Sequence, residues 1–457
     1  MQEIKRVWKQ SKLYRILLIA AVIYMALRLI FQGGYLAMML LPEAGIMGGI
    51  PDWVGAEGPM IPADLQIYLN AAKHFYHREN LYLQGSLERL EEHFPYGPPF
   101  AMIFTPFLLL SPGATAVVHT ALHFIAYGFL YLSWDRIFKK YNLENAHHAL
   151  AWTLPMWLVF SSFWTDLGYL NIYIIMALFG TLFIEAIMDE QFGWSLFWLS
   201  VIIQIKPHWT FAAAVPLLLG RRRFFFKLIG RAILVYVAVV GLTLLIAGPT
   251  YGWQQYGDYV EFLGRLSQDF PWRGPAAGFL GYNHSIKQTV VYLLGTSPGS
   301  FQLATALKVL LLLPLAGLGL HYLLHPIDRA GYEVPQLALD VAFALYLGAF
   351  IWLDMVWELS LGVAIFPYLL GTLQHKKSRI LASVGFLPYA LLDPWRVGSF
   401  AIGGMSVILP GPYVATDPAI YIPLIMIAIL TFYGLLIWRL YQASSIGSMK
   451  SNAKGAI

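Results

Sequence analysis

The chain has 457 residues, of which 58% are hydrophobic and only 12% charged, and its mean hydropathy is +0.61. Soluble domains carry roughly 25% charged residues, so the composition excludes a soluble domain and indicates an all-α polytopic membrane protein. The absence of cysteine excludes disulfides, thiolate metal sites and cysteine nucleophiles. Basic residues cluster in short loops, so the net charge of +5 reflects membrane topology and predicts no nucleic-acid partner.

Apolar runs recur along the whole chain, and a helix needs about 20 apolar residues to cross a membrane. The first run follows a basic N-terminus and is predicted to be a retained span that enters from the cytoplasm. The stretch 285–295 is too short to cross and is predicted to be re-entrant or interfacial. We expect twelve spans in the cell membrane, with both termini in the cytoplasm, at 13–33, 98–111, 113–134, 147–164, 169–188, 194–219, 227–248, 300–324, 337–355, 357–373, 379–395 and 418–441.

Basic residues agree with this topology only in part. The run Arg221–Arg223 falls on the inner side, as the positive-inside rule expects, whereas Arg136 and Lys140 fall outside. The turn that holds Asp166 and Asn171 falls inside, and a catalytic role is therefore not expected for it.

The first external loop, 34–97, is long enough to carry chemistry. An interfacial helix is predicted from Ala63 to Arg78, because apolar residues recur at helical spacing and Pro62 stands at its start. A second, acidic helix is expected at 86–93. The apolar positions of the first helix are Leu65, Leu69, Ala72 and Tyr76.

The second external loop, 249–282, is rich in Trp, Tyr, Gly and Pro, and a helix is expected near 253–268. The loop ends an N-terminal module, residues 1–282, which precedes a C-terminal module, residues 283–457.

Asp64 is the first candidate for chemistry. It is a lone carboxylate just after the first span, in the first turn of the predicted loop helix. Such a group can serve as a general base. The alternative is that it only caps the helix and interacts with its dipole, and the residue alone leaves both interpretations open.

Lys206 is the second candidate, because it lies in the middle of the predicted span 194–219. An ionisable group inside the membrane is costly and is a functional-site hypothesis by default. Pro207 breaks the helix beside it. Lys206 is expected to hold a phosphate or, alternatively, to form an internal ion pair with Glu185 or Asp340.

A late external turn holds Trp352, Asp354, Trp357 and Glu358. Tryptophan faces stack on sugar C–H groups and carboxylates bind hydroxyls, so this turn fits sugar recognition. An aromatic belt at the membrane interface explains the same residues equally well.

Polar residues also precede the short stretch 285–295. Asn283 or Ser285 is expected to cap a short helix there, and Lys287 to meet an anionic group near its N-terminus. For Ser285, capping alone is the preferred interpretation.

Several strings, in their order, resemble the GT-C superfamily of integral-membrane glycosyltransferases. The resemblance is closest to glycosyltransferase family 87, the polyprenyl-phosphate-mannose-dependent α-mannosyltransferases, and covers roughly residues 10–300. Family members often have a tryptophan followed by histidine at the late turn, where Trp357-Glu358 stands here. The matching strings are Asp64-x-x-x-Tyr68, Asn80-Leu81-Tyr82, Tyr96-x-Pro98-Pro99, Gly168-x-x-Asn171 and Lys206-Pro207.

The resemblance implies a GT-C fold with about 12 transmembrane helices and juxtamembrane helices on the external face. It implies inverting transfer of a sugar from a polyprenyl-phosphate donor to a hydroxyl of a glycolipid or glycan acceptor, with Asp64 as general base. No cofactor is expected, and the lack of a DxD-type pair predicts metal independence. The candidate substrate-binding residues are Tyr68, Tyr96, Lys206, His208, Asn283, His284, Lys287, Trp357, Glu358 and Arg396.

Two other functions fit the same sequence. Lys206 and Glu185 inside apolar segments are compatible with a transporter or flippase of lipid-linked sugars. The missing histidine is compatible with an inactive GT-C-like scaffold. If that histidine helps to hold the donor phosphate in the family, another cation must do so here, and the candidates are His284, Lys287, Arg273 and Arg396.

Overall fold

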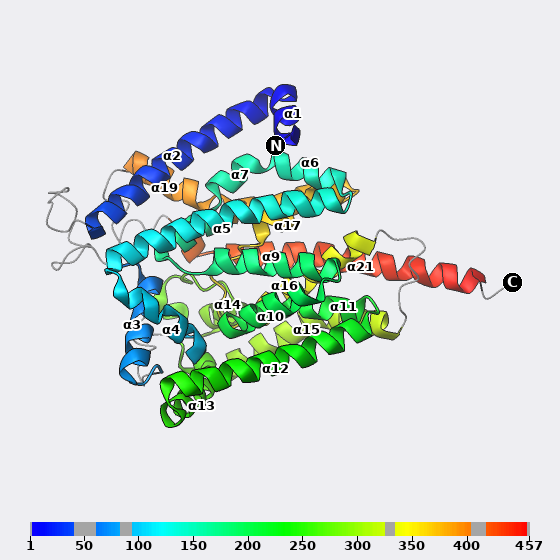
Figure 1. Ribbon diagram of the computed structural model, residues 1–457. Coiled ribbons are helices and arrows are strands. Elements are labelled where there is room, and N and C mark those ends of the chain that lie inside the picture. The colour runs from blue at the N-terminus through cyan, green and yellow to red at the C-terminus, as the bar shows by residue number, and fades with distance from the viewer. Residues whose placement is uncertain (1, 41–60, 83–93, 325–333, 404–416, 455–457) are drawn as a thin grey trace.

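The structure is a computed structural model that describes residues 2–40, 61–82, 94–324, 334–403 and 417–454. Regular structure within these residues is helical throughout, without a strand, which confirms the all-α prediction. Most long helices run roughly along one direction and form a bundle (Figure 1). Helices α3, α4 and α13 lie together at one end of this bundle, which is the end that carries the candidate site (Figure 1).

The described residues form helices throughout both halves of the chain. The first half contains α1 Gln2–Gln10, α2 Lys12–Leu40, α3 Ala63–His77, α4 Pro98–Phe104, the 3₁₀ helix η4 Thr105–Leu109, α5 Pro112–Lys140, α6 Glu144–Trp152, α7 Leu154–Val159, α8 Ser161–Tyr169, α9 Tyr173–Met188, α10 Phe192–Ile205, the 3₁₀ helix η5 Pro207–Ala214 and α11 Val215–Leu218. The second half contains α12 Arg222–Ala247, α13 Pro249–Asp269, the 3₁₀ helix η6 Pro275–Ala277, α14 Ile286–Leu294, α15 Pro298–Leu324, α16 Val334–Trp352, α17 Gly362–Thr372, α18 Lys376–Ala390, α19 Leu392–Gly403, the 3₁₀ helix η8 Pro418–Ile420 and α21 Leu424–Lys454.

Six of the described helices are long and apolar enough to cross a membrane: α2, α5, α12, α15, α16 and α21. A seventh span results if the chain 154–169 and the helix 173–188, which meet at a bend of 117°, are counted together. The twelve predicted spans are therefore not confirmed. The physical reason is that hydropathy counts apolar residues but does not register breaks, and several predicted spans consist of short helices such as α6, α7 and α8.

The predicted span 194–219 is a hairpin that returns to the end at which it starts. Helix α10 has 14 residues, or about 21 Å at ~1.5 Å per residue, which is too short for a hydrocarbon core of ~30 Å. The chain leaves α10 at Lys206 and continues as η5 from Pro207. Arg221 Nε lies 3.1 Å from Glu190 Oε1, so the two ends of the segment are neighbours.

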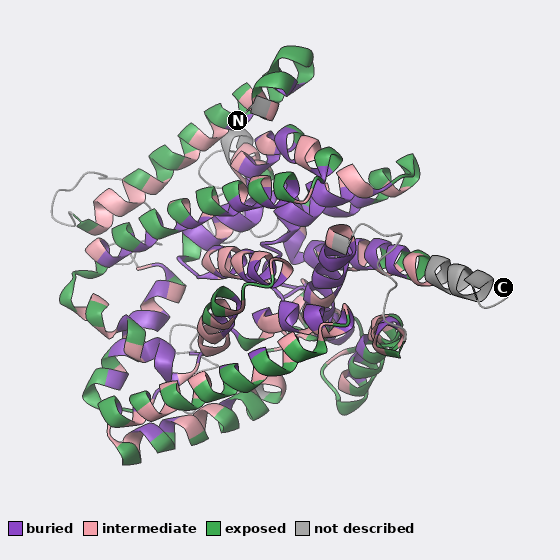
Figure 2. Cartoon of the chain, turned by 45° about the vertical axis from the view of Figure 1, so that its right-hand side comes forward, coloured by how far each residue is buried: buried purple, intermediate pink, exposed green. Residues whose placement is uncertain are grey.

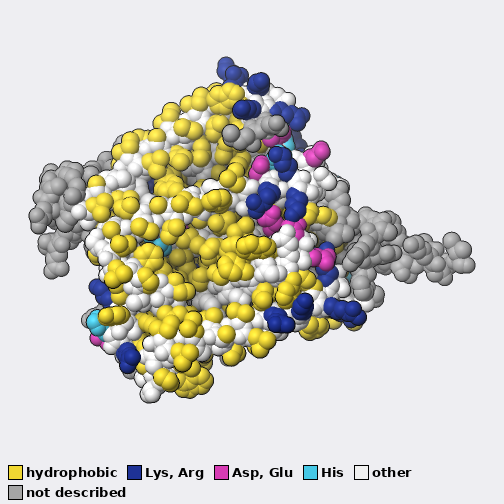
Figure 3. All heavy atoms as spheres, in the orientation of Figure 1, with side chains coloured by type: hydrophobic (Ala, Val, Ile, Leu, Met, Phe, Trp, Pro, Cys, Tyr) yellow, Lys and Arg dark blue, Asp and Glu magenta, His cyan; other side chains and the backbone are white. Residues whose placement is uncertain are grey.

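Ion pairs correct the predicted topology around α5. Arg136 Nε donates to Glu185 Oε1 at 2.8 Å, and Lys140 pairs with Asp189. The C-terminal ends of α5 and α9 therefore lie together, at the same end as Arg221. The prediction that Arg136 and Lys140 lie on the opposite side from the arginine run is wrong. Lysine and arginine side chains gather at this end, beside a largely apolar surface (Figure 3).

Burial separates the inner helices from those that face lipid. Buried residues concentrate in the middle of the bundle, whereas α2, α12 and α15 show long exposed faces (Figure 2). The exposed side chains on these outer helices are largely apolar, including Ile30, Leu245 and Leu310. A helix that is apolar on its exposed face fits a bilayer, where acyl chains replace water. The protein is therefore a membrane protein.

Candidate active site

Helix α3 carries Asp64 and forms where the sequence predicts a helix. Pro62 precedes it, and Arg78 ends it in a left-handed conformation with φ 61°. Three of the four expected apolar positions are buried, but Tyr76 is 68% exposed and Phe75 packs inward in its place. The acidic helix predicted at 86–93 lies outside the described residues. The helix expected near 253–268 is confirmed as the longer α13.

Asp64 is half-buried and does not cap its helix, because no side chain caps the α3 N-terminus. Its carboxylate instead has a hydrogen bond with the Asn171 side chain. Burial raises the pKa of Asp64 to about 6, the nearby Lys206 ammonium opposes this rise, and Asp166 adds to it. A carboxylate that titrates near neutral pH is well matched to proton abstraction.

Two buried tyrosines, Tyr68 and Tyr96, lie beside Asn171, whose side chain bonds to Asp64. The hydroxyls of Tyr68 and Tyr96 lie 3.0 Å apart, and the Tyr68 hydroxyl donates to Asn171 Oδ1 at 3.2 Å. Their rings meet edge-on with centroids 5.4 Å apart. The structure therefore brings Tyr68 and Tyr96 together beside Asp64, on residues from α3 and from the segment before α4.

Lys206 reaches this group from the hairpin. Its side chain is buried, and its Nζ lies 3.6 Å from the centre of the Tyr173 ring and 5.2 Å from that of Tyr96. The two acids considered as ion-pair partners lie elsewhere, since Glu185 pairs with Arg136 and Asp340 with Arg439. The ammonium instead interacts electrostatically with Asp64 and Asp166.

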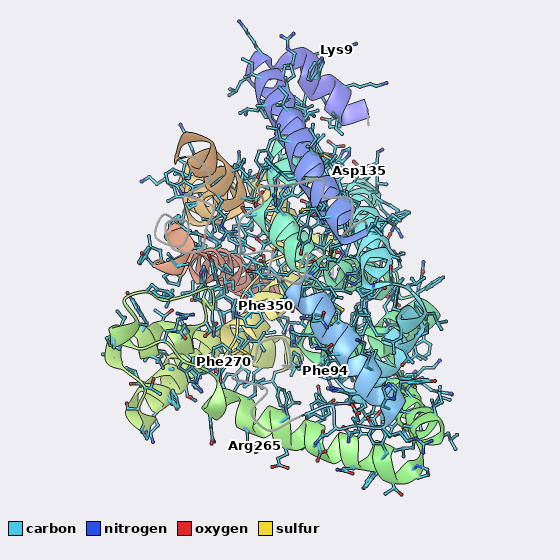
Figure 4. All side chains as sticks on the ribbon, turned by 90° about the vertical axis from the view of Figure 1, so that its left-hand side faces the viewer. Lys9, Phe94, Asp135, Arg265, Phe270 and Phe350 are labelled. Atoms are coloured by element: carbon cyan, nitrogen blue, oxygen red, sulfur yellow. The ribbon has the colours of Figure 1, made fainter. Side chains whose placement is uncertain are left out.

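His208 follows two residues after Lys206 and is half-buried, with its ring 5.8 Å from that of Phe350. Figure 4 views the molecule from the α3 end and shows Phe350 beside one end of α3, near the middle of the view. His208 thus lies against the core on the same hairpin as Lys206.

Asp166 and Asn171, which the predicted topology placed on the inner side, lie beside Asp64. Leu170 adopts a left-handed conformation with φ 52° and turns the chain between α8 and α9. Both Asp166 carboxylate oxygens accept from the first backbone N–H groups of α9, those of Tyr173 at 3.1 Å and Ile174 at 2.9 Å. The prediction that this turn lies away from the loop carrying Asp64 is wrong. The string Gly168-x-x-Asn171 was the one sequence signal for it.

Glu358 and Arg396 approach the same region from the C-terminal half. The Tyr389 hydroxyl donates to Glu358 Oε2 at 2.7 Å, and burial raises the pKa of Glu358 to about 8. Arg396 Nε pairs with Asp417 Oδ2 at 2.8 Å, and Nη1 donates to Thr165 Oγ1 at 3.4 Å. Thr165 directly precedes Asp166, so Arg396 lies next to the α8–α9 turn.

The Asn283 side chain holds the segment after α16, and the His284 ring contacts the backbone of η8 and α21; neither side chain bonds to Asp64 within the described residues. Asn283 Oδ1 accepts from the backbone N–H of Val356 at 3.1 Å. His284 Nδ1 accepts from the Ile425 N–H at 3.1 Å, and Nε2 donates to the Ala419 carbonyl at 2.8 Å. Both nitrogens of this neutral ring are therefore engaged with backbone groups.

Lys287 belongs to a separate buried network. Its Nζ donates to Ser267 Oγ at 2.6 Å and lies 3.3 Å from Asp354 Oδ2, while Lys308 pairs with the other oxygen of Asp354. Ser285 caps α14, as preferred from the sequence, by accepting from the Gln288 N–H at 3.1 Å. Trp357 is half-buried in the segment between α16 and α17.

Comparison with protein families shows a match to the model of glycosyltransferase family 87 over residues 94–353. Neither the curated proteins nor the solved structures gave a match. The matched stretch covers more than half of the chain and includes Tyr96, the α8–α9 turn and Lys206, whereas Asp64 precedes it. The chain belongs to glycosyltransferase family 87, and it is a membrane glycosyltransferase that acts on a sugar donor and an acceptor.

Proposed function

We propose that the enzyme transfers a sugar, in the first instance mannose, from a polyprenyl-phosphate donor to a hydroxyl of a glycolipid or glycan acceptor. Asp64 acts as the general base, and the configuration at the anomeric carbon is inverted. The observation that carries this proposal is the half-buried Asp64 carboxylate, held by Asn171 and faced by the buried ammonium of Lys206.

The reaction needs one base and one cationic partner. Asp64 accepts the proton of the acceptor hydroxyl as its oxygen attacks the anomeric carbon. The bond from that carbon to the phosphate oxygen breaks, and polyprenyl phosphate leaves with the electron pair. A phosphate leaving group needs positive charge or hydrogen-bond donors, not a general acid. Lys206 supplies that charge in this proposal, and Arg396 beside the α8–α9 turn is a second candidate.

A metal ion is not needed in this scheme, because the ammonium of Lys206 stabilises the leaving phosphate. We therefore expect turnover to persist in EDTA. The remaining site assignments, His208, Asn283, His284, Lys287, Trp357 and Glu358, stay candidates for the donor and acceptor sugars.

The site is proposed to face the outside of the cell membrane, with both termini in the cytoplasm. The end that carries Arg136, Lys140 and Arg221 then faces the cytoplasm, in agreement with the positive-inside rule. The division into modules 1–282 and 283–457 stays a prediction.

The test uses purified protein in nanodiscs with polyprenyl-phosphate-mannose and a panel of glycolipid acceptors. Release of polyprenyl phosphate and the mass of the product are followed by mass spectrometry. Asp64→Asn should lower turnover by roughly 10²–10⁴-fold, the usual contribution of general base catalysis. Glu79→Gln is the matched control, because Glu79 follows the same helix but is 61% exposed.

Each other outcome has a defined meaning. Undiminished turnover by Asp64→Asn would refute the assigned base. Failure of the wild type with mannose but not with another polyprenyl-linked sugar would change the donor sugar only. Movement of a labelled lipid across liposomes without a new glycosidic bond would support the transport alternative. Failure with every donor would favour the inactive scaffold.

A further inference from the structure

A buried histidine in α5 contacts the turn that holds Asp64. His123 Nδ1 lies 2.8 Å from the carbonyl oxygen of His119, one helical turn earlier. Its Nε2 contacts the carbonyl oxygen of Asn171 and lies 3.2 Å from Asp166 Oδ2. All three partners are oxygens that only accept when Asp166 is ionised, so both ring nitrogens carry protons. His123 is then an imidazolium paired with the Asp166 carboxylate.

Asp166 connects this cation to the start of α9. Asp166 Oδ1 accepts from the N–H group of Tyr173, and Oδ2 accepts from that of Ile174. The same Oδ2 atom lies beside the His123 imidazole. Unpaired N–H groups at a helix N-terminus favour a negative partner. His123 and Asp166 together therefore hold both sides of the chain reversal at Leu170.

The reversal presents Asn171 to the base. The Asn171 side-chain oxygen accepts from the Tyr68 hydroxyl at 3.2 Å and from the Ile172 N–H at 2.6 Å. With its oxygen engaged, the amide group is left to donate to Asp64, consistent with the hydrogen bond between these side chains. Movement of the turn would therefore move the hydrogen-bond donor of the catalytic carboxylate.

We propose that His123 and Asp166 are positioning residues, whose ion pair fixes the α8–α9 turn so that Asn171 orients the Asp64 carboxylate toward the acceptor hydroxyl. The inference rests on the proposed role of Asp64 as base. Neither residue is assigned contact with substrate. His123, with its ring in the bundle core, acts on the reaction only through the turn.

Charge balance gives the pair a second effect. Asp64 and Asp166 carry two negative charges, and Lys206 and His123 carry two positive charges. Loss of the imidazolium would leave the Asp166 charge uncompensated and so disfavour ionisation of Asp64. The other titratable or charged groups near this set include Tyr68, Tyr96, His119, Tyr169, Tyr173, His208, Glu358 and Arg396.

The experiment compares His123→Leu with His119→Leu in the full-length protein, in the nanodisc assay with polyprenyl-phosphate-mannose. Both histidines are buried on the same helix, but His119 Nδ1 makes no hydrogen bond within the described residues. His123→Leu should lower kcat by roughly 100-fold, the scale of a small misplacement of a reacting group, with KM for the donor within a few-fold. In the pH–rate profile of His123→Leu, the fall of activity at acid pH should begin at a higher pH than in the wild type.

Two more variants separate positioning from folding. His123→Gln retains a donor for the turn and should recover part of the lost kcat. Asp166→Asn keeps the volume of the side chain but removes the charge, so it should lower kcat in the same way even if His123→Leu does not fold. Folding is checked by the melting temperature of each variant in the same nanodiscs.

The inference is overturned if His123→Leu and Asp166→Asn keep the wild-type kcat and acid limb, or if His119→Leu loses as much kcat as His123→Leu. It is also overturned if the variants have a lower melting temperature but an unchanged kcat. A wild type that transfers no sugar would instead refute the proposed function, so the two failures are distinguishable.

Discussion

Protonation of Asp64 should set the acid limb of the pH–rate profile. A pKa of about 6 leaves ~10% of the carboxylate ionised at pH 5, whereas the ordinary value of 3.8 would leave more than ~90% ionised. Because a base must be ionised to accept a proton, kcat/KM should fall roughly tenfold between pH 7 and pH 5.

Replacement of Lys206 by methionine tests the origin of this limb. The ammonium favours the ionised form of Asp64, so its removal leaves burial and Asp166 to raise the pKa further. An opposite charge at short range typically lowers a carboxyl pKa by roughly 1–3 units. The limb of Lys206→Met should therefore move upward by at least about one pH unit, in addition to any loss of maximal rate.

The assay is the initial rate of polyprenyl phosphate release between pH 4.5 and 9, in one detergent and at fixed ionic strength. Asp64→Asn supplies the background rate. Lys308→Met is the matched control, because Lys308 is also a buried lysine but pairs with Asp354 in the separate network. A wild-type rate that stays flat down to pH 5, or an acid limb that Lys206→Met leaves in place, would show that the Asp64 carboxylate is not the group that titrates.

Three further predictions follow from buried polar contacts. Tyr68→Phe removes the hydroxyl that bonds to Asn171 and should lower kcat by about 10-fold, from roughly 1–1.5 kcal/mol per hydrogen bond, as steady-state kinetics would show. Arg439→Leu leaves Asp340 buried and unpaired and should lower the free energy of unfolding by about 3–5 kcal/mol, and adding Asp340→Leu should restore much of the loss in thermal melting. Burial raises the pKa of Glu358 to about 8, so the wild type loses stability as pH rises from about 4.5 to 8. Glu358→Gln should therefore have a higher melting temperature than wild type, by a margin that grows over this pH range. A margin that does not change with pH would contradict this prediction.

Local sequence signals predicted the part of the site carried by α3. Helical spacing and Pro62 place Asp64 in the first turn, and the Tyr68 and Tyr96 strings mark residues that do meet in the structure. These contacts depend on one helix and the segment that follows it. Helical spacing is therefore sufficient to place Asp64 on this helix, whereas Tyr68 and Tyr96 were named only from the family resemblance.

Contacts between segments that double back along the bundle were not predicted from the sequence. Asp166 and Asn171 were placed on the wrong side because hydropathy counted 98–111 as a full crossing, whereas this stretch consists of the short helices α4 and η4. His123 has no sequence signal at all, since a histidine in an apolar helix becomes informative only when its acceptors are known.

The hairpin that carries Lys206 has a mechanical consequence. The two ends of the hairpin are joined by the ion pair of Arg221 and Glu190 at one end of the bundle, whereas Asp64 belongs to a helix at the opposite end. The distance between the Asp64 carboxylate and the Lys206 ammonium thus depends on how far the hairpin, anchored at one bilayer surface, reaches toward the other surface. Bilayers that differ in hydrophobic thickness impose mismatch on membrane helices at a cost of fractions of a kcal/mol per Å. Transfer should therefore have an optimum in acyl-chain length, with thicker bilayers drawing Lys206 away from Asp64.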